Sequence, residues 1–194
     1  STLIKRVMEG LVIPNIEDLY QRERAKDELP QSGSGRTIMT AEPKFVPEHA
    51  VEISPDGTAK LSVRLIDSVG YMVRGAIGAT EGGQPRMVTT PWYDHEIPMT
   101  EAAELGTKKV MEEHSTIGLV VTTDGTVTDI PRADYIEAEE RAIRDMQATG
   151  KPFLVVVNSA RPDAPEAQTL RDYLQDTYGV SAMAVDCQSM QDAE

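Results

Sequence analysis

The sequence is poor in cysteine, in aromatic residues and in basic charge. Its single cysteine, Cys187, cannot form an internal disulfide, which argues against a disulfide-stapled extracellular fold and favours a reducing cytoplasm. Lysine and arginine number 19 against 32 aspartate and glutamate residues, giving a net charge of −13. This balance disfavours a general nucleic-acid binder and spontaneous adhesion to anionic lipid. No apolar run approaches the roughly 18 residues that a membrane span needs.

What the sequence does have fits one soluble domain with an aliphatic core. Its 194 residues are 40% hydrophobic and 26% charged, and aromatic residues make up only 5%. Short β-branched runs predict strands at 50–54, 59–66, 117–123, 153–157 and 180–185. Pro55-Asp56-Gly57 predicts a hairpin between the first two. The runs at 117–123 and 153–157 are continuously apolar, which predicts strands buried on both faces of a parallel sheet.

Helical patterns alternate with the later strands. We expect a helix over Glu101–His114, with Thr100 as its N-cap and His114 on its inward face. Two further apolar faces predict helices that end at Gly150 and at Gly179, and they consist of Ala133, Ile136, Ile143 and Met146, and of Ala167, Leu170, Leu174 and Tyr178. This alternation predicts right-handed βαβ units in a three-layer α/β fold with a mostly parallel sheet. The segments 31–46 and 69–99 are expected to be loops that are functional or mobile.

The most informative local motif follows the strand at 59–66. Asp67-Ser68-Val69-Gly70 is a D-x-x-G turn, in which the carboxylate of nucleotide triphosphatases orders a water on Mg²⁺ and the Gly70 amide reaches the terminal phosphate. The alternative is plain turn chemistry, because aspartate and glycine are common after any strand.

Ser1, Thr2 and Thr40 are further candidates. Ser1-Thr2 opens an amphipathic helix, as the hydroxyl residue after the lysine of a G-x-x-x-x-G-K-[ST] phosphate loop does; an ordinary N-capped helix is the alternative. Thr37 and Thr40 lie between this helix and the hairpin, where triphosphatases place a threonine that senses the γ-phosphate. A solvated linker is the alternative there.

The tetrapeptide Asn158-Ser159-Ala160-Arg161 follows the apolar run at 153–157. A guanine-binding N-K-x-D motif would begin at this asparagine, although a simple turn is the favoured explanation of the residue taken alone. In that motif the final aspartate accepts hydrogen bonds from guanine, whereas Arg161 only donates. The four residues therefore predict adenine rather than guanine in any nucleotide bound here.

Taken in order, these signals match a Ras-like P-loop triphosphatase whose first strand and phosphate loop are missing from the 194 residues. The histidines lack the spacing of a zinc site. Glu137, Glu139 and Glu140 predict a solvated acidic face, with a catalytic carboxylate pair as the alternative. Cys187 predicts a small core or loop residue.

Longer segments carry a specific family resemblance along essentially the whole chain. The chain resembles the stage IV sporulation protein A family, on the segments ELPQSGSGRTIMTAEPKFVP (28–47), RLIDSVGY (64–71), TPWYDHEIP (90–98), EEHSTIGLVVTTDGTVTDI (112–130), DYIEAEERAI (134–143) and KPFLVVVNSARP (151–162). The resemblance implies a P-loop ATPase domain of the translation-factor class over residues 1–194, truncated at both ends, with the middle and C-terminal regions beyond it.

The resemblance also implies an activity and partners. Members of the family are expected to hydrolyse ATP with Mg²⁺ and to polymerise into a shell on which spore-coat proteins assemble. The implied place is the mother-cell cytoplasm, at the outer forespore membrane. Recruitment there is implied through a small amphipathic peptide, stage V sporulation protein M, and through regions absent from this chain. No nucleic-acid partner is expected.

Individual residues take roles from the resemblance. Ser1, Thr40 and Asp67 match Mg²⁺-linked positions, and Thr40 also matches the threonine that senses the γ-phosphate. Ala41 stands where some members carry a second threonine. Tyr71 stands where many GTPases carry a water-positioning glutamine, so the residue that orients the attacking water stays unassigned. Two alternatives to a self-assembling ATPase are a nucleotide-binding structural module without essential turnover and an assembly GTPase.

Overall fold

The computed structural model describes residues 1–30 and 37–190, so part of the predicted loop at 31–46 lies outside the described residues. The described chain divides into two compact units. The first consists of residues 1–30, 44–67 and 187–190, and the second of residues 37–43 and 68–186. Each unit is described by itself.

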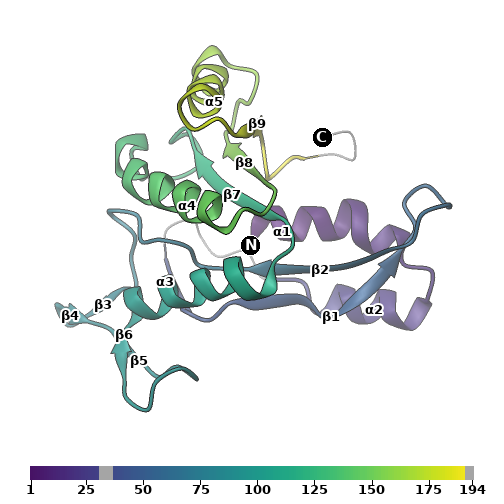
Figure 1. Ribbon diagram of the computed structural model, residues 1–194, viewed down its shortest axis with the longest axis horizontal. Helices are drawn as coiled ribbons and strands as arrows, with labels where there is room; N and C mark the ends of the chain where they lie inside the picture. Colours follow the sequence, from purple (N-terminus) through teal and green to yellow (C-terminus); the bar gives the residue numbers. More distant parts are fainter. Residues whose placement is uncertain (31–36, 191–194) are drawn as a thin grey trace. The chain divides into compact units, whose positions relative to one another are not determined.

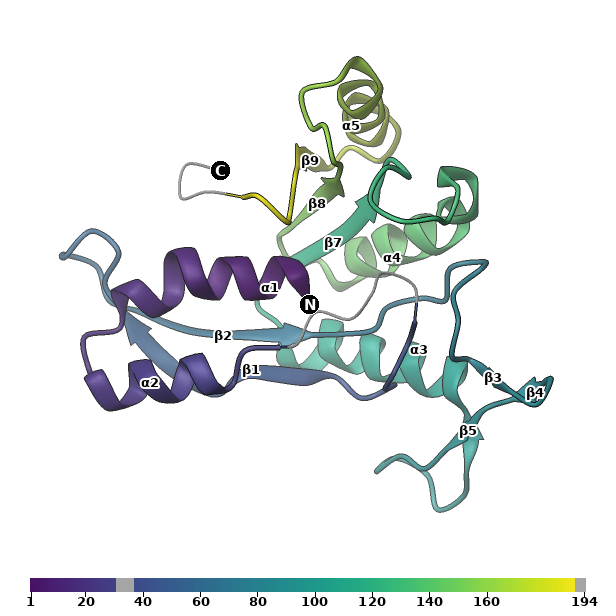
Figure 2. The ribbon, with the colours of Figure 1, turned by 180° about the vertical axis from the view of Figure 1, so that it is seen from behind.

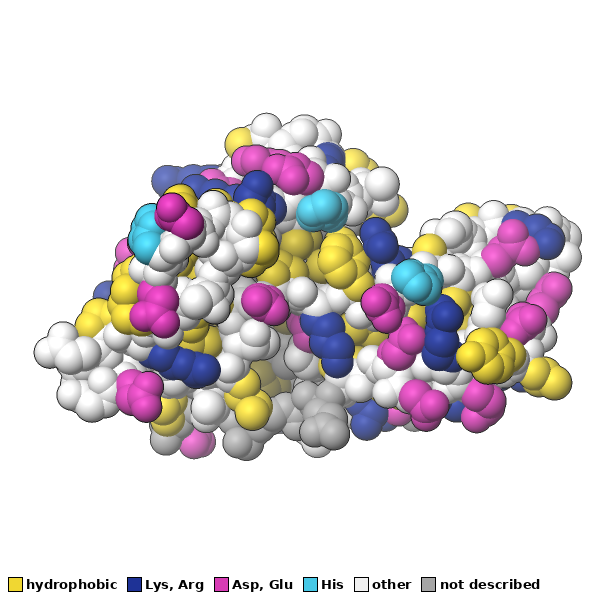
Figure 3. Space-filling view, turned by 90° about the horizontal axis from the view of Figure 1, so that it is seen from below, with side chains coloured by type: hydrophobic (Ala, Val, Ile, Leu, Met, Phe, Trp, Pro, Cys, Tyr) yellow, Lys and Arg dark blue, Asp and Glu magenta, His cyan; other side chains and the backbone are white. Residues whose placement is uncertain are grey.

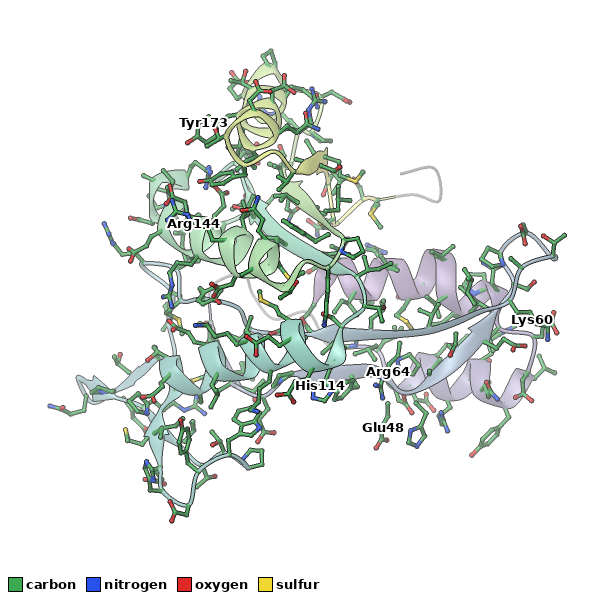
Figure 4. All side chains as sticks on the ribbon, viewed as in Figure 1. Glu48, Lys60, Arg64, His114, Arg144 and Tyr173 are labelled. Atoms are coloured by element: carbon green, nitrogen blue, oxygen red, sulfur yellow. The ribbon has the colours of Figure 1, made fainter. Side chains whose placement is uncertain are left out.

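The first unit is built on an antiparallel hairpin of β1 (Lys44–Ile53) and β2 (Leu61–Asp67). The predicted hairpin is confirmed, although β1 begins at Lys44, inside the segment predicted to be a loop. The Asp56 carboxylate closes the turn by accepting the backbone N–H groups of Thr58 and Ala59, each at 2.9 Å. These hydrogen bonds lower the pKa of Asp56 to about 2. The Arg64 guanidinium lies 4.4 Å from the centroid of the Phe45 ring on the same hairpin (Figure 4).

Helices α1 (Thr2–Val7) and α2 (Leu19–Asp27) lie along this hairpin, on the side turned toward the viewer in Figure 2. Between them, η1 (Met8–Val12) and η2 (Ile13–Asn15) continue the chain. Within η1, a π-helical turn, Met8 and Val12 are buried and Leu11 is 49% exposed. The sequence did not predict α2 because six of its nine residues are polar or charged and the helix has no apolar face: Leu19 and Tyr20 are exposed, and only Ala25 is buried. The core of the unit consists of Met8, Val12, Ile13, Ile16, Ala25, Val46, Val51 and Ile53.

The second unit contains the predicted parallel sheet, with strands in the order β7 (Gly118–Thr123), β8 (Phe153–Asn158) and β9 (Ser181–Val185). Figure 1 shows α4 (Ile136–Thr149) along β7, and α5 (Pro165–Tyr178) beside β8 and β9. Both helices end at the predicted glycines, Gly150 and Gly179, which adopt φ values of 68° and 64°. Mixed α/β architecture with a parallel three-stranded sheet is therefore confirmed.

Two burial predictions for this unit are wrong, one for strand β7 and one for helix α4. Leu119 and Val121 of β7 are 52% and 51% exposed, although the apolar run predicted burial on both faces. Helix α4 packs on the face that carries Val120, so alternate residues of β7 point away from it. Ala133 precedes α4, in the 3₁₀ turn η4 (Arg132–Asp134), and Ile136 at the start of α4 is 43% exposed.

Helix α3 (Met99–Lys109) and η3 (Val110–His114) cover the predicted helix at 101–114, with two differences. The N-cap is Pro98 rather than Thr100, because the extended backbone of Pro98 lets the helix begin at Met99. His114 is exposed at the end of η3 (Figure 4), since the π-helical turn rotates it away from the inward face. Short strand pairs occupy the predicted loop at 69–99, namely β3 (Thr80–Glu81) with β4 (Gln84–Pro85), and β5 (Met87–Val88) with β6 (Ile97–Pro98).

Charges of both signs are interspersed on the face shown in Figure 3. Among the described residues, no helix has the length and apolarity required to cross a membrane.

Candidate functional site

The end of β2 brings two predicted site residues together in the first unit. Asp67 is the last residue of β2, and Ser1 directly precedes α1. The Ser1 hydroxyl donates to Asp67 Oδ2 at 2.5 Å. Residues 66 positions apart therefore present a hydroxyl and a carboxylate side by side, which are the hard oxygen ligands that Mg²⁺ prefers. Thr2 follows as the first, half-buried residue of α1.

Thr40 belongs to the second unit, on the segment that precedes β1. Its side chain is exposed, and its Oγ1 accepts the backbone N–H of Glu42 at 3.1 Å. Thr40 lines an open cavity of about 420 Å³, together with Arg86, Trp92 and Met99 among other residues. The neighbouring Ala41 is buried beside Met99. A methyl group therefore packs at the position where some relatives were expected to carry a second hydroxyl.

The D-x-x-G turn continues from Asp67 into the second unit, where helix α3 holds it. The Gly70 N–H donates to Thr107 Oγ1 at 3.0 Å, and Gly70 adopts a φ of 80°, which favours glycine. Tyr71 is buried, and its hydroxyl donates to the Asp145 carboxylate of α4. Burial is the main cause that raises the pKa of Tyr71 well above its ordinary value, and Asp145 adds to the effect.

A second cluster of predicted residues lies at the ends of β7 and β8. Asn158 is the last residue of β8 and pairs with Thr123 of β7 and Val185 of β9. Ser159 is completely buried; its hydroxyl donates to Asp124 Oδ2 at 2.6 Å and accepts the Arg161 N–H at 3.0 Å. The Arg161 side chain itself is exposed. The structure thus gathers these residues into one loop at the carboxyl edge of the parallel sheet.

Asp124 and Thr126 are the residues of this cluster that the sequence analysis missed. Thr126 donates its hydroxyl to Asp124 Oδ1 at 2.6 Å and accepts the Ala160 N–H at 2.9 Å. The available signal was Asp124-Gly125, an aspartate and a glycine directly after the apolar strand β7, comparable with the D-x-x-G turn at the end of β2. Together the two residues tie the loop after β7 to the loop after β8.

The expected acidic face on α4 needs one correction. Glu137 is exposed, but Glu139 is buried: Thr122 donates to its Oε2 at 2.5 Å, and Arg132 Nη2 lies 2.6 Å from its Oε1. Glu139 is therefore a paired internal carboxylate that joins β7 to α4, because a buried charge requires such partners. Arg132 Nη1 is buried without a hydrogen-bond partner among the described residues.

Across residues 1–30 and 37–190, no three histidine, cysteine, aspartate or glutamate side chains form a metal-binding cluster. Cys187 is buried, as a small core residue would be. The oxygen donors of Ser1 and Asp67 suit a cation that keeps most of its water ligands, as Mg²⁺ does.

Comparisons with known proteins identify one protein family. The family model for "Stage IV sporulation protein A, ATPase domain" matches residues 1–194. The chain is 52% identical over 194 residues to stage IV sporulation protein A of Bacillus anthracis, 51% to that of Bacillus subtilis (strain 168) and 49% to that of Clostridioides difficile (strain 630). All of this chain is covered, against 39%, 39% and 40% of those proteins. No solved structure matches it.

The predicted family resemblance is therefore confirmed over the full length of the chain. The chain spans about 40% of the length of the curated relatives that it matches. It belongs to the family of the stage IV sporulation protein A ATPase domain.

Proposed function

We propose that this chain forms part of an ATPase whose turnover drives self-assembly of a basement layer for the spore coat. Membership of an ATPase-domain family supports the activity, and the sporulation proteins among its relatives support the setting. The observation that carries the proposal is the contact between the Ser1 hydroxyl and the Asp67 carboxylate. These are the two groups expected to face Mg²⁺ in a P-loop triphosphatase.

In this proposal, Ser1 and Asp67 hold the cation, and the chain's other polar groups recognise ATP. Bound Mg²⁺ would neutralise charge on the β- and γ-phosphates. Thr40 offers a hydroxyl to the terminal phosphate, and the Gly70 turn offers a backbone N–H. Asn158, Ser159 and Arg161 form the loop for the base. Thr2 contributes at the start of α1.

The finer parts of the proposal concern architecture and partners. The domain is a Ras-like P-loop fold of the translation-factor class, with its first strand and phosphate loop supplied by the longer protein. The assembled layer lies on the outer forespore membrane and faces the mother-cell cytoplasm. Coat proteins and stage V sporulation protein M bind through regions outside these residues.

The test measures phosphate release from ATP by the full-length protein. We expect Asp67→Asn to lower turnover about 10- to 100-fold, because the cation loses its orienting carboxylate. Asp27→Asn is the matched control: Asp27 is exposed at the end of α2, in the same unit. Thr40→Ala should lower kcat about tenfold or more with little change in nucleotide affinity, since its hydroxyl acts on charge that develops in the transition state.

Normal turnover by both Asp67→Asn and Thr40→Ala would contradict the assignment of the site. Sedimentation of the full-length protein, which measures assembly, distinguishes the proposed ATPase from a nucleotide-binding structural module and from an assembly GTPase. A structural module would assemble with a non-hydrolysable ATP analogue and release no phosphate from ATP. An assembly GTPase would release phosphate from GTP instead.

A further inference from the structure

Thr107 of α3 holds the turn that offers its amide to the terminal phosphate. Its side chain is buried, with the residue only 4% exposed. Its Oγ1 accepts the Gly70 N–H at 3.0 Å and lies 2.7 Å from the Ser68 hydroxyl. One buried hydroxyl thus contacts both the second and the last residue of the turn.

The residue after the turn is also anchored. Tyr71 is 6% exposed, its hydroxyl donates to Asp145, and the Arg141 guanidinium lies 4.5 Å from the centroid of its ring. Arg141 in turn forms two hydrogen bonds, of 3.0 and 2.8 Å, with the Glu104 carboxylate of α3. Helix α3 therefore holds the turn at Ser68 and Gly70, and helix α4 holds the residue that follows it, so packing restricts the direction of the Gly70 N–H.

Gly70 itself is open on one side. Its φ of 80° disfavours any residue with a Cβ, and among the described residues no atom beyond its two chain neighbours lies within 4 Å of the position that a Cβ would take. There is space for an incoming group beside the turn, while the N–H of the same residue is occupied by Thr107.

We propose that Thr107 is a positioning residue that competes with the terminal phosphate of ATP for the Gly70 N–H. The inference rests on the proposed function. One N–H forms one good hydrogen bond, so a phosphate oxygen has to displace the Thr107 hydroxyl. A charged oxygen is the stronger acceptor. The displaced hydroxyl keeps Ser68 as a partner, so no buried polar group is left unpaired.

With this arrangement, the hydrogen bond between Thr107 and Gly70 depends on whether the bound nucleotide has a γ-phosphate. ADP lacks the group that takes the Gly70 N–H, so Thr107 keeps its contact when ADP is bound. ATP breaks that contact, and its affinity is reduced by the worth of one net hydrogen bond, about threefold to tenfold.

The experiment compares binding of ADP and of a non-hydrolysable ATP analogue, with Mg²⁺, by the full-length protein. Thr107→Val keeps the shape of the side chain and removes the acceptor. We expect it to tighten binding of the analogue about threefold to tenfold and to leave ADP affinity unchanged. Thr107→Ser, which restores a hydroxyl, should return the ratio of the two affinities to that of the wild-type protein.

If the affinity for the ATP analogue relative to that for ADP is unchanged or lower in Thr107→Val, the inference is overturned. A threonine with a merely structural role would affect the binding of both nucleotides alike. If Thr107→Val fails to fold, hydrogen exchange of the wild-type protein provides the test. We expect the Gly70 amide hydrogen to be protected from exchange in the absence of nucleotide. Exchange as fast as that of an unprotected amide would contradict its contact with Thr107. A wild-type protein that binds neither nucleotide would instead refute the proposed function.

Discussion

At the scale of single residues, Arg161 is the basis for expecting adenine rather than guanine in the bound nucleotide. It stands where a guanine-binding loop carries an aspartate, and its guanidinium only donates hydrogen bonds. Guanine presents donors at N1 and at its 2-amino group, whereas adenine presents an acceptor at N1. Ser159, at the place of the usual lysine, is buried and bonded to Asp124. These two differences from the guanine-binding motif, Ser159 and Arg161, both remove features that favour guanine.

We therefore predict that the full-length protein prefers ATP over GTP by at least roughly tenfold, or about 1.4 kcal/mol. The measurement is competition by GTP in an ATP-hydrolysis assay. Arg161→Ala should reduce the preference, because the mismatched donor is gone. Arg144→Ala is the control, since Arg144 is an exposed residue of α4 (Figure 4). Equal competition by GTP in the wild-type protein would move the function toward a GTPase.

At the scale of elements, the Asp124 carboxylate connects the ends of β7 and β8. It accepts hydrogen bonds from the hydroxyls of Ser159 and Thr126, both at 2.6 Å, and from the Thr126 N–H at 3.0 Å. Partial burial raises the pKa of Asp124, but these hydrogen bonds outweigh the burial and leave it below its ordinary value of 3.8. The ionised carboxylate therefore stabilises the folded state.

Asp124→Asn should lower the free energy of unfolding by about 1–3 kcal/mol at pH 7, because hydrogen bonds to a charged acceptor are lost. Since the pKa is lower in the folded protein, this stabilisation is complete above the ordinary pKa and is lost as the pH falls through the folded value. The difference in the free energy of unfolding between the wild-type protein and Asp124→Asn should therefore become smaller below about pH 4. Denaturant titrations from pH 7 to pH 3 measure it.

The exposed Asp129 provides the control for this comparison, and Asp129→Asn should leave the free energy of unfolding nearly unchanged. A gap between wild type and Asp124→Asn that stays constant down to pH 3 would show that the charge of Asp124 contributes nothing.

At the scale of the whole molecule, the 194 residues hold no G-x-x-x-x-G-K-[ST] run. In P-loop proteins that run supplies the backbone amides and the lysine that bind most of the phosphate oxygens. We therefore predict that the isolated chain of residues 1–194 binds ATP negligibly. Calorimetric titration measures this, with the full-length protein as the positive control. Micromolar binding by the isolated chain would show that its own residues suffice.

Several elements were predictable from the sequence because their signals are local. The Pro55-Asp56-Gly57 turn predicted the hairpin, and Gly150 and Gly179 predicted where α4 and α5 end. Runs of β-branched residues predicted β7, β8 and β9. Each signal depends on neighbouring residues only, on turn geometry or on the spacing of apolar side chains along one element.

Contacts between distant segments decided what these local patterns left open. The same apolar pattern in β7 is compatible with burial on one face or on both, and only the packing of α4 left Leu119 and Val121 exposed. Glu139 belongs to an acidic run that suggests solvent, yet Arg132 and Thr122 enclose it.

The chain's family, its α/β class and the identity of Ser1, Asp67 and Arg161 as candidates follow from the sequence by itself, since motifs and periodicity are local properties. Tertiary structure alone decided that the Ser1 hydroxyl meets Asp67 and that Thr107 holds the Gly70 amide. These partners lie 66 and 37 positions apart. A hydrogen bond over such a separation depends on how whole elements pack, which no local pattern encodes.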